Sequence, residues 1–115
     1  MQVSFEDFKK LEIKIGKVIK VEDHPNADKL YLVTLDLGCD AEGKRIEKTL
    51  VAGIRAYYAK EELVGKSLAV IVNLEPATIR GIVSEGMILA ASDKDKKHVF
   101  VLTSDKPIDS GSRVS

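Results

Sequence analysis

The sequence predicts an all-β fold in a single domain, and three observations support this. Apolar and polar residues alternate over several short stretches, which is the two-residue period of a half-buried strand. Glycine, proline and aspartate cluster between these stretches, as they do in turns. At 115 residues, of which 44% are hydrophobic, the chain is long enough to build one core.

The first element is a short helix over residues 4–12, which Ser4 can cap. Phe5, Phe8 and Leu11 follow at helical spacing and share one face. This aromatic edge is expected to dock on the body of the protein or on a partner.

Residues 11–21 predict the first strand. Its buried phase consists of Leu11, Ile13, Ile15, Ile19 and Val21. Lys17 falls on this apolar phase directly after Gly16, which predicts a bulge or a sharp bend. Lys14 and Lys20 fall on the other phase and are expected to project from one face of the strand.

The remaining elements follow in chain order. Strands are predicted over residues 30–38, 45–53, 67–74, 86–92 and 98–103, and a short helix over about 59–64. The segment His24–Asp28 is dense in turn formers. Residues 75–81 are expected to form a loop because Pro76 excludes a central strand there. Residues 104–115 are expected to form a polar tail.

A short helix inserted after the third strand is the order of the oligonucleotide/oligosaccharide-binding (OB) fold, a partly open five-stranded barrel. A small β-sandwich is the competing arrangement. The chain is accordingly divided into an N-terminal helical extension, residues 1–10, and an OB-fold domain, residues 11–115.

Composition restricts the function. Basic and acidic residues both number 18, so any positive surface has to be assembled by the fold. The single cysteine, Cys39, and the lack of a signal peptide favour a cytoplasmic protein. No apolar run approaches membrane-spanning length. No zinc-binding cluster, glycine-rich phosphate loop or nucleophile elbow is present, so neither catalysis nor a metal or cofactor is expected.

Three segments carry a resemblance to a known family: "GKVIKVEDHPNADKLYLVTLDLG", "VAGIRAYYAKEELVGKSLAVIVNLEPATIRGIVSEGMILAAS" and the closing "GSRV". They resemble the tRNA-binding domain, which is appended to methionyl-tRNA synthetases and to cofactors of the endothelial-monocyte-activating-polypeptide type and also occurs free-standing. The resemblance implies binding at the outer corner of tRNA by shape, frequent homodimerisation and no catalysis. The chain departs from the family pattern at Ala52 and Ala59-Lys60.

Ten residues are candidates for RNA binding: Lys14, Lys17, Lys20, Asn26, Lys29, Arg55, Arg80, Ser84, Gly86 and Met87. The cations can pair with phosphates, and Ser84 can hydrogen-bond a phosphate or a ribose hydroxyl. Gly86 can admit a close approach by RNA or by neighbouring backbone. Met87 can pack against a base or belong to the core. Ordinary surface or turn roles remain open for the other candidates, and His24 is expected to be a turn residue and not a ligand.

The leading hypothesis is a non-catalytic, homodimeric tRNA-binding protein that acts with methionyl-tRNA synthetase. Phe5, Phe8 and Leu11 are its candidate dimerisation residues. Low aromatic content, 5%, favours recognition of folded RNA over reading of single strands. The alternative is a protein-interaction or chaperone-like module with weak or no RNA binding, which the neutral charge favours.

Overall fold

The computed structural model describes residues 1–115 and contains two short helices and ten strands. In chain order they are α1 (Phe5–Lys9), β1 (Ile13–Asp23), β2 (Tyr31–Cys39), β3 (Arg45–Ala52), α2 (Lys60–Leu63), β4 (Ser67–Ile71), β5 (Ala77–Ile79), β6 (Ile82–Ser84), β7 (Met87–Ile88), β8 (Ala90–Ser92), β9 (Val99–Val101) and β10 (Arg113–Val114). The all-β prediction is confirmed. Neither helix has the length and apolar character that crossing a lipid bilayer demands.

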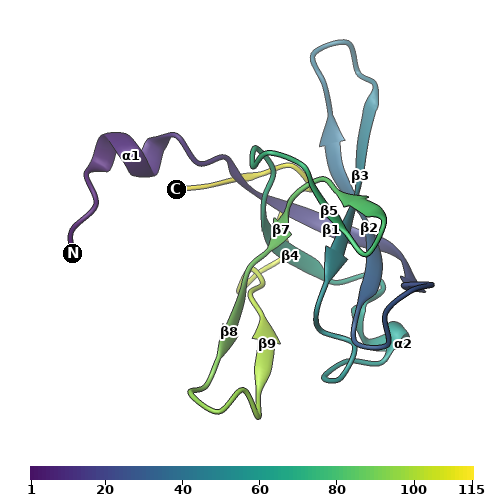
Figure 1. The fold of residues 1–115 in the computed structure, drawn as a ribbon. Coiled ribbons are helices and arrows are strands. Elements are labelled where there is room, and N and C mark those ends of the chain that lie inside the picture. The colour runs from purple at the N-terminus through teal and green to yellow at the C-terminus, as the bar shows by residue number, and fades with distance from the viewer.

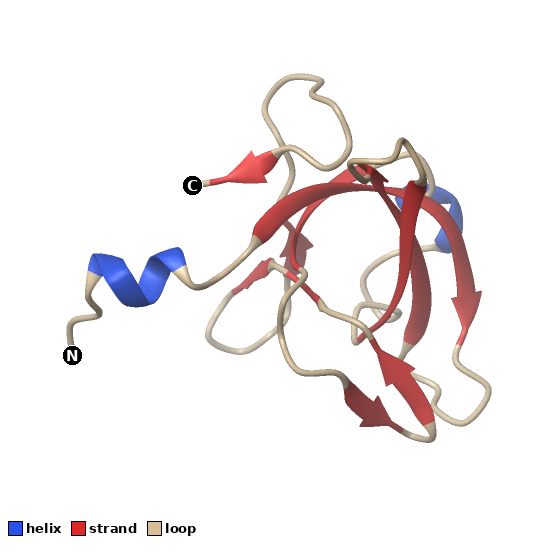
Figure 2. Cartoon of the chain, turned by 90° about the horizontal axis from the view of Figure 1, so that it is seen from above, coloured by secondary structure: helices blue, strands red, loops and turns tan.

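The main sheet is antiparallel, runs in the order β3-β2-β1-β4-β7, and carries β10 as an extra strand beside β1. Viewed end-on, it curls into an OB-like barrel, while α1 projects outside it (Figure 2). The β5–β6 and β8–β9 hairpins form two small separate sheets. Figure 1 shows the β8–β9 hairpin extending away from the barrel.

Strand β1 bends because it serves two neighbours. Residues 13–17 pair with β4, and residues 17–23 pair with β2. The register shifts by one residue between Val18 and Lys20, so the predicted irregularity is confirmed, but the extra residue is Ile19. Val18 is buried, whereas Ile19, expected in the core, is 44% exposed.

This shift contradicts the expectation that Lys14 and Lys20 share a face. Lys14 pairs with Val70, whose side chain is fully buried. Lys20 pairs with Thr34, which alternates with the buried residues Val33 and Leu35. Because directly paired residues point to the same side of a sheet, Lys14 follows the inner face and Lys20 the outer one.

The barrel interior is a cluster of twelve buried residues: Val18, Val21, Tyr31, Val33, Leu35, Leu37, Leu50, Ala52, Ile54, Leu63, Leu68 and Val70. Leu63 brings α2 into this cluster and is fully buried. The Tyr31 hydroxyl donates a hydrogen bond to the Tyr58 carbonyl at 2.7 Å, so the one phenol in the core has a polar partner.

Three predicted boundaries differ from the structure. The expected loop 75–81 contributes β5 to a hairpin, which is compatible with Pro76 because the proline precedes the paired residues. The expected strand 86–92 divides: β7 pairs with β4, and β8 pairs with β9. The expected polar tail returns as β10 against the start of β1. The β5–β6 and β8–β9 pairings are local hairpins, whereas β10 pairs with a segment at the opposite end of the chain.

Candidate nucleic-acid interface

One end of the barrel is organised around His24, which is only 3% exposed. Its Nε2–H donates to the Ile79 carbonyl at 3.0 Å, and its Nδ1 accepts the Asn26 backbone N–H at 3.0 Å. This pattern fits the neutral ring. The imidazole therefore fastens the loop after β1 to the tip of the β5–β6 hairpin.

The hairpin tip presents Arg80 in an unusual conformation. Arg80 and Gly81 have φ angles of 53° and 88°, as the two central residues of a type I′ turn require. A left-handed backbone costs a side-chain-bearing residue about 1–2 kcal/mol. The Asn26 amide donates to the Arg80 carbonyl at 3.2 Å, which helps to hold this geometry, while the guanidinium group stays exposed.

An open cleft of about 420 Å³ lies beside this turn and is lined by Ala27, Asp28, Lys29, Leu30 and Arg80. Lys29 and Arg80 are both exposed. The structure therefore brings together three sequence-predicted residues, Asn26, Lys29 and Arg80, from segments some fifty residues apart. Two cations beside one cleft can hold a phosphate.

Arg55 lies at the same end of the barrel. Its guanidinium group is 6.0 Å from the Tyr31 ring centre and its Nε is 3.5 Å from Asp23. Lys60 also pairs with Asp23, at 3.2 Å. A single carboxylate thus faces two cations, so this group keeps an excess of positive charge. Lys60 was missed from the sequence because its neighbour Asp23 is 37 positions away.

Ser84 is buried, with 4% of its surface exposed. Its hydroxyl accepts the Val51 N–H at 2.9 Å and donates to the Gly86 carbonyl at 3.0 Å. Next to it, Glu85 exchanges hydrogen bonds with Thr49, one through its carboxylate and one through its backbone N–H. These contacts join the β6–β7 connection to β3 and close the barrel. Because the Ser84 hydroxyl is buried and already hydrogen-bonded, it is not placed to make the expected direct contact with RNA.

Gly86 admits neighbouring backbone. A Cβ at this position would lie 2.6 Å from the Ile71 carbonyl oxygen and 3.4 Å from a Leu50 methyl. Of the two approaches anticipated for Gly86, the structure therefore displays the one by backbone. Met87, the next residue, is 53% exposed and is outside the core.

The three lysines of β1 do not form one row. Lys14 lies opposite Arg113 in the backbone pairing of β1 with β10. Lys17 lines a separate cleft of about 590 Å³ together with the C-terminal segment. Lys20 forms an ion pair with Glu22 at 3.4 Å. None of them lines the cleft beside Arg80.

Helix α1 leaves its aromatic side chains uncovered. Phe5 and Phe8 are 70% and 39% exposed, with ring centres 6.4 Å apart. Together with Leu11 and the C-terminal residues Arg113 to Ser115 they line a groove of about 410 Å³. The helix stands on an arm outside the barrel (Figures 1 and 2).

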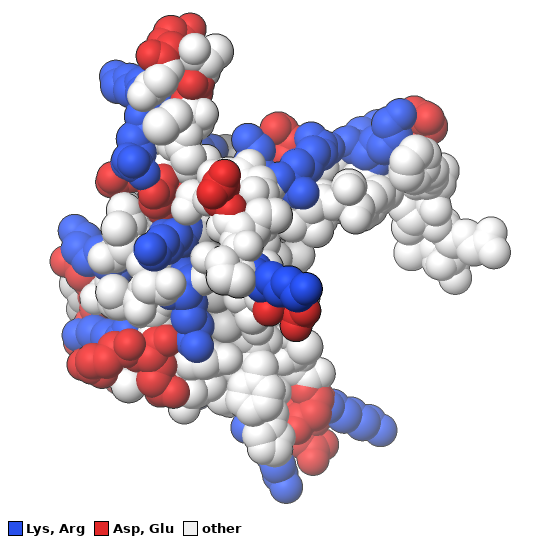
Figure 3. Space-filling model, turned by 180° about the vertical axis from the view of Figure 1, so that it is seen from behind, with Lys and Arg blue, Asp and Glu red and all other residues white.

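Charges of both signs are interleaved over the face drawn in Figure 3, and basic side chains also run along the arm that leads to α1. No broad face in this view carries one sign. On this face a polyanion would meet small groups of cations and no broad positive patch.

Comparisons with known proteins agree on one family. A family model described as "Putative tRNA binding domain" matches residues 13–113. Methionine–tRNA ligases of Nanoarchaeum equitans and Pyrococcus abyssi are 53% and 48% identical over 112 and 114 residues. The alignments cover 97% and 99% of this chain but 13% and 15% of those ligases, so the chain corresponds to a small part of them.

Two solved structures share the whole fold. A methionyl-tRNA-synthetase-related protein from Pyrococcus horikoshii superposes with a TM-score of 0.87 at 30% identity, covering 100% of this chain and 99% of that one. The chaperone CsaA from Bacillus anthracis superposes with a TM-score of 0.86 at 27% identity, covering 100% of both chains.

Proposed function

Because the chain belongs to the putative tRNA-binding domain family, we propose that it binds the outer corner of tRNA through the barrel end that carries Asn26, Lys29, Arg55 and Arg80. The observation that carries this proposal is the convergence of Lys29 and Arg80 on one open cleft. The left-handed Arg80 adds support, since strained residues cluster at binding sites.

The residues of this end take different parts. Arg80 can make paired hydrogen bonds to a phosphate, and Lys29 adds a mobile point charge. Asn26 already donates to the Arg80 carbonyl, so it positions the turn. Asp28 lines the same cleft and repels phosphate, which restricts where the backbone of the RNA can lie.

Ser84 and Gly86 support the proposed site indirectly. They help to close the barrel from which the β5–β6 hairpin extends, and that hairpin carries Arg80. Met87 and the lysines of β1 lie outside the cleft. The exposed Lys17, Lys20 and Met87 can make further contacts with RNA that extends beyond the cleft.

We further propose that the chain is non-catalytic and acts with methionyl-tRNA synthetase. The sequence similarity to methionine–tRNA ligases supports this pairing. A domain that holds tRNA raises its effective concentration for a catalytic site elsewhere.

Homodimerisation through α1 is the third part of the proposal. The exposed Phe5 and Phe8, and the groove that they share with Leu11, offer a surface that a second copy can cover. Replacing Phe5 and Phe8 together by serine is expected to give a monomer in sedimentation equilibrium, whereas the parent chain sediments as a dimer. A parent chain that is monomeric throughout contradicts this part alone.

Titration of labelled tRNA at several salt concentrations tests RNA binding. We expect log Kd to rise linearly with log salt, and Arg80→Ala to weaken binding and reduce the slope by about one. Lys44→Ala, an exposed lysine in the β2–β3 turn, is the matched control and should leave both unchanged. A parent chain without detectable binding at low salt removes the proposal.

A second candidate function is chaperone-like binding of apolar polypeptide. The uncovered aromatic face of α1 and the likeness to a chaperone structure favour it. Suppression of the aggregation of a denatured client by the parent chain, lost in the variant with Phe5→Ser and Phe8→Ser, would support this function.

A further inference from the structure

The β8–β9 hairpin carries a group of features that the proposed tRNA site leaves unused. Its connecting loop contains three exposed lysines, Lys94, Lys96 and Lys97. The hairpin extends beyond the barrel (Figure 1), where a bulky ligand can reach it.

An exposed aromatic surface lies on the strand that follows this loop. Phe100 is 55% exposed, and the His98 ring lies 5.6 Å from it at an interplanar angle of 50°. The residue paired with Phe100 across the hairpin is Ala91. Because alanine is too small to cover a phenyl ring, one face of Phe100 is left without a cross-strand partner.

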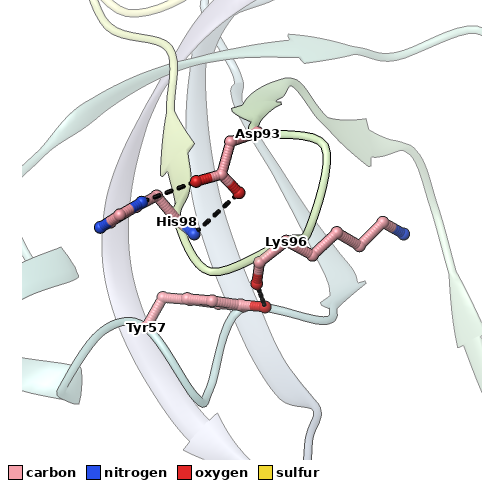
Figure 4. Close-up of polar contacts among 4 residues, drawn as sticks. All are labelled: Tyr57, Asp93, Lys96 and His98. Carbon is pink, nitrogen blue, oxygen red and sulfur yellow. Dashed lines mark hydrogen bonds and ion pairs between the residues drawn. The ribbon is translucent and has the colours of Figure 1, made fainter.

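The loop is held in one conformation (Figure 4). The Asp93 carboxylate accepts the His98 Nδ1–H at 2.7 Å and the His98 backbone N–H at 3.1 Å. The Tyr57 hydroxyl donates to the Lys96 carbonyl at 2.8 Å, and the Tyr58 hydroxyl accepts the Val101 N–H at 3.1 Å. The lysines and Phe100 therefore sit on a preorganised support.

The charges around the aromatic surface favour an anionic ligand. The connecting loop carries the two acids Asp93 and Asp95 and three lysines, so basic residues outnumber acidic ones by one. The hairpin is also tied to the segment that carries Arg55, since Tyr57 follows Arg55 by two residues and contacts Lys96. This hydrogen bond therefore links the hairpin to the segment that carries Arg55.

We propose that the β8–β9 hairpin is a second RNA contact, in which an unpaired base stacks on Phe100 while adjacent phosphates pair with Lys94, Lys96 and Lys97. The inference rests on the proposed function and adds a subsite for unstacked nucleotides. Stacking on an aromatic ring tolerates any base, because every base has a π face. The subsite therefore contributes affinity without sequence preference.

Substitutions at Phe100 test this subsite, with tRNA and a blunt-ended RNA duplex as the two probes. Phe100→Tyr keeps the ring, whereas Phe100→Leu keeps an apolar side chain without it. We expect Phe100→Tyr to bind tRNA like the parent and Phe100→Leu to bind about tenfold more weakly. On the duplex, which has no unpaired base, the three proteins should bind alike.

Arg80→Ala, measured in parallel, separates the failure of this inference from the failure of the proposed function. If Arg80→Ala weakens tRNA binding while Phe100→Leu binds like the parent, the hairpin subsite is wrong and the barrel-end site stands. Equal losses on tRNA and on duplex for Phe100→Leu also overturn the subsite, since they show an effect other than base stacking. A parent chain that binds no tRNA overturns both.

Discussion

The Nε2 atom of His24 lies 3.0 Å from the carbonyl oxygen of Ile79, 55 positions further along the chain. This hydrogen bond connects the loop after β1 to the β5–β6 hairpin, and the other ring nitrogen holds the Asn26 N–H. The buried His24 therefore fixes the relative positions of the two segments that carry Asn26 and Arg80.

His24→Ala is expected to destabilise the protein and weaken tRNA binding together. It removes the His24 hydrogen bonds to the Ile79 carbonyl and the Asn26 N–H, and because both groups are only partly shielded from water, the cost should lie at or below the value of about 1–3 kcal/mol for a buried unpaired group. Urea unfolding should show a lower midpoint, and tRNA titration a higher Kd. The control is Lys44→Ala, which should change neither value. A His24→Ala protein with the parental midpoint and Kd would contradict the positioning role of His24.

Arg80→Gly is expected to move stability and affinity in opposite directions. Glycine adopts the φ of 53° without the strain that arginine carries, so the free energy of unfolding should rise by about 1 kcal/mol. Affinity for tRNA should fall, because the guanidinium group is gone. Arg80→Ala should lose affinity without the gain in stability, and a Gly variant that binds tRNA like the parent contradicts the site.

Gly86→Ala is expected to destabilise the barrel by several kcal/mol, because the new methyl group would lie 2.6 Å from the Ile71 carbonyl oxygen. Gly53→Ala is the matched control, since its Cβ would meet only a Leu30 methyl at 3.7 Å. Thermal unfolding of the two variants compares them directly. Similar melting temperatures would show that β4 and β7 can separate without cost.

The Asp93–His98 pair gives a pH prediction. Hydrogen bonds from the His98 ring and then from the His98 backbone N–H hold the pKa of Asp93 below its ordinary value of 3.8. Because the folded pKa is lower than the unfolded one, the stabilising contribution is complete above 3.8 and is lost as pH falls through the folded pKa.

An NMR titration of the Asp93 side-chain carboxyl carbon measures this. We expect a midpoint below 3.8 in the parent chain and a midpoint closer to 3.8 in His98→Ala. A midpoint that is the same in both proteins would show that His98 does not set the pKa of Asp93.

Local patterns were sufficient for much of the fold. The alternation in residues 30–38 and 45–53 matches β2 and β3 closely, because both strands bury one face and expose the other. Ser4 caps α1 through the Asp7 N–H at 3.1 Å, as its position before the helix predicts. The β5–β6 hairpin was not predicted, since arginine is an uncommon first residue for a type I′ turn.

The sequence by itself determined the all-β architecture, the bent first strand and the family, because each depends on residue types at short spacing. Only the tertiary structure decided which cations lie together. Lys29 and Arg80 share a cleft, whereas the bulge at Ile19 puts Lys14 and Lys20 on opposite faces of the sheet. It also decided that Ser84 turns inward. The physical reason is that one inserted residue reverses every side chain beyond it, and barrel closure brings together backbone groups that no local pattern relates.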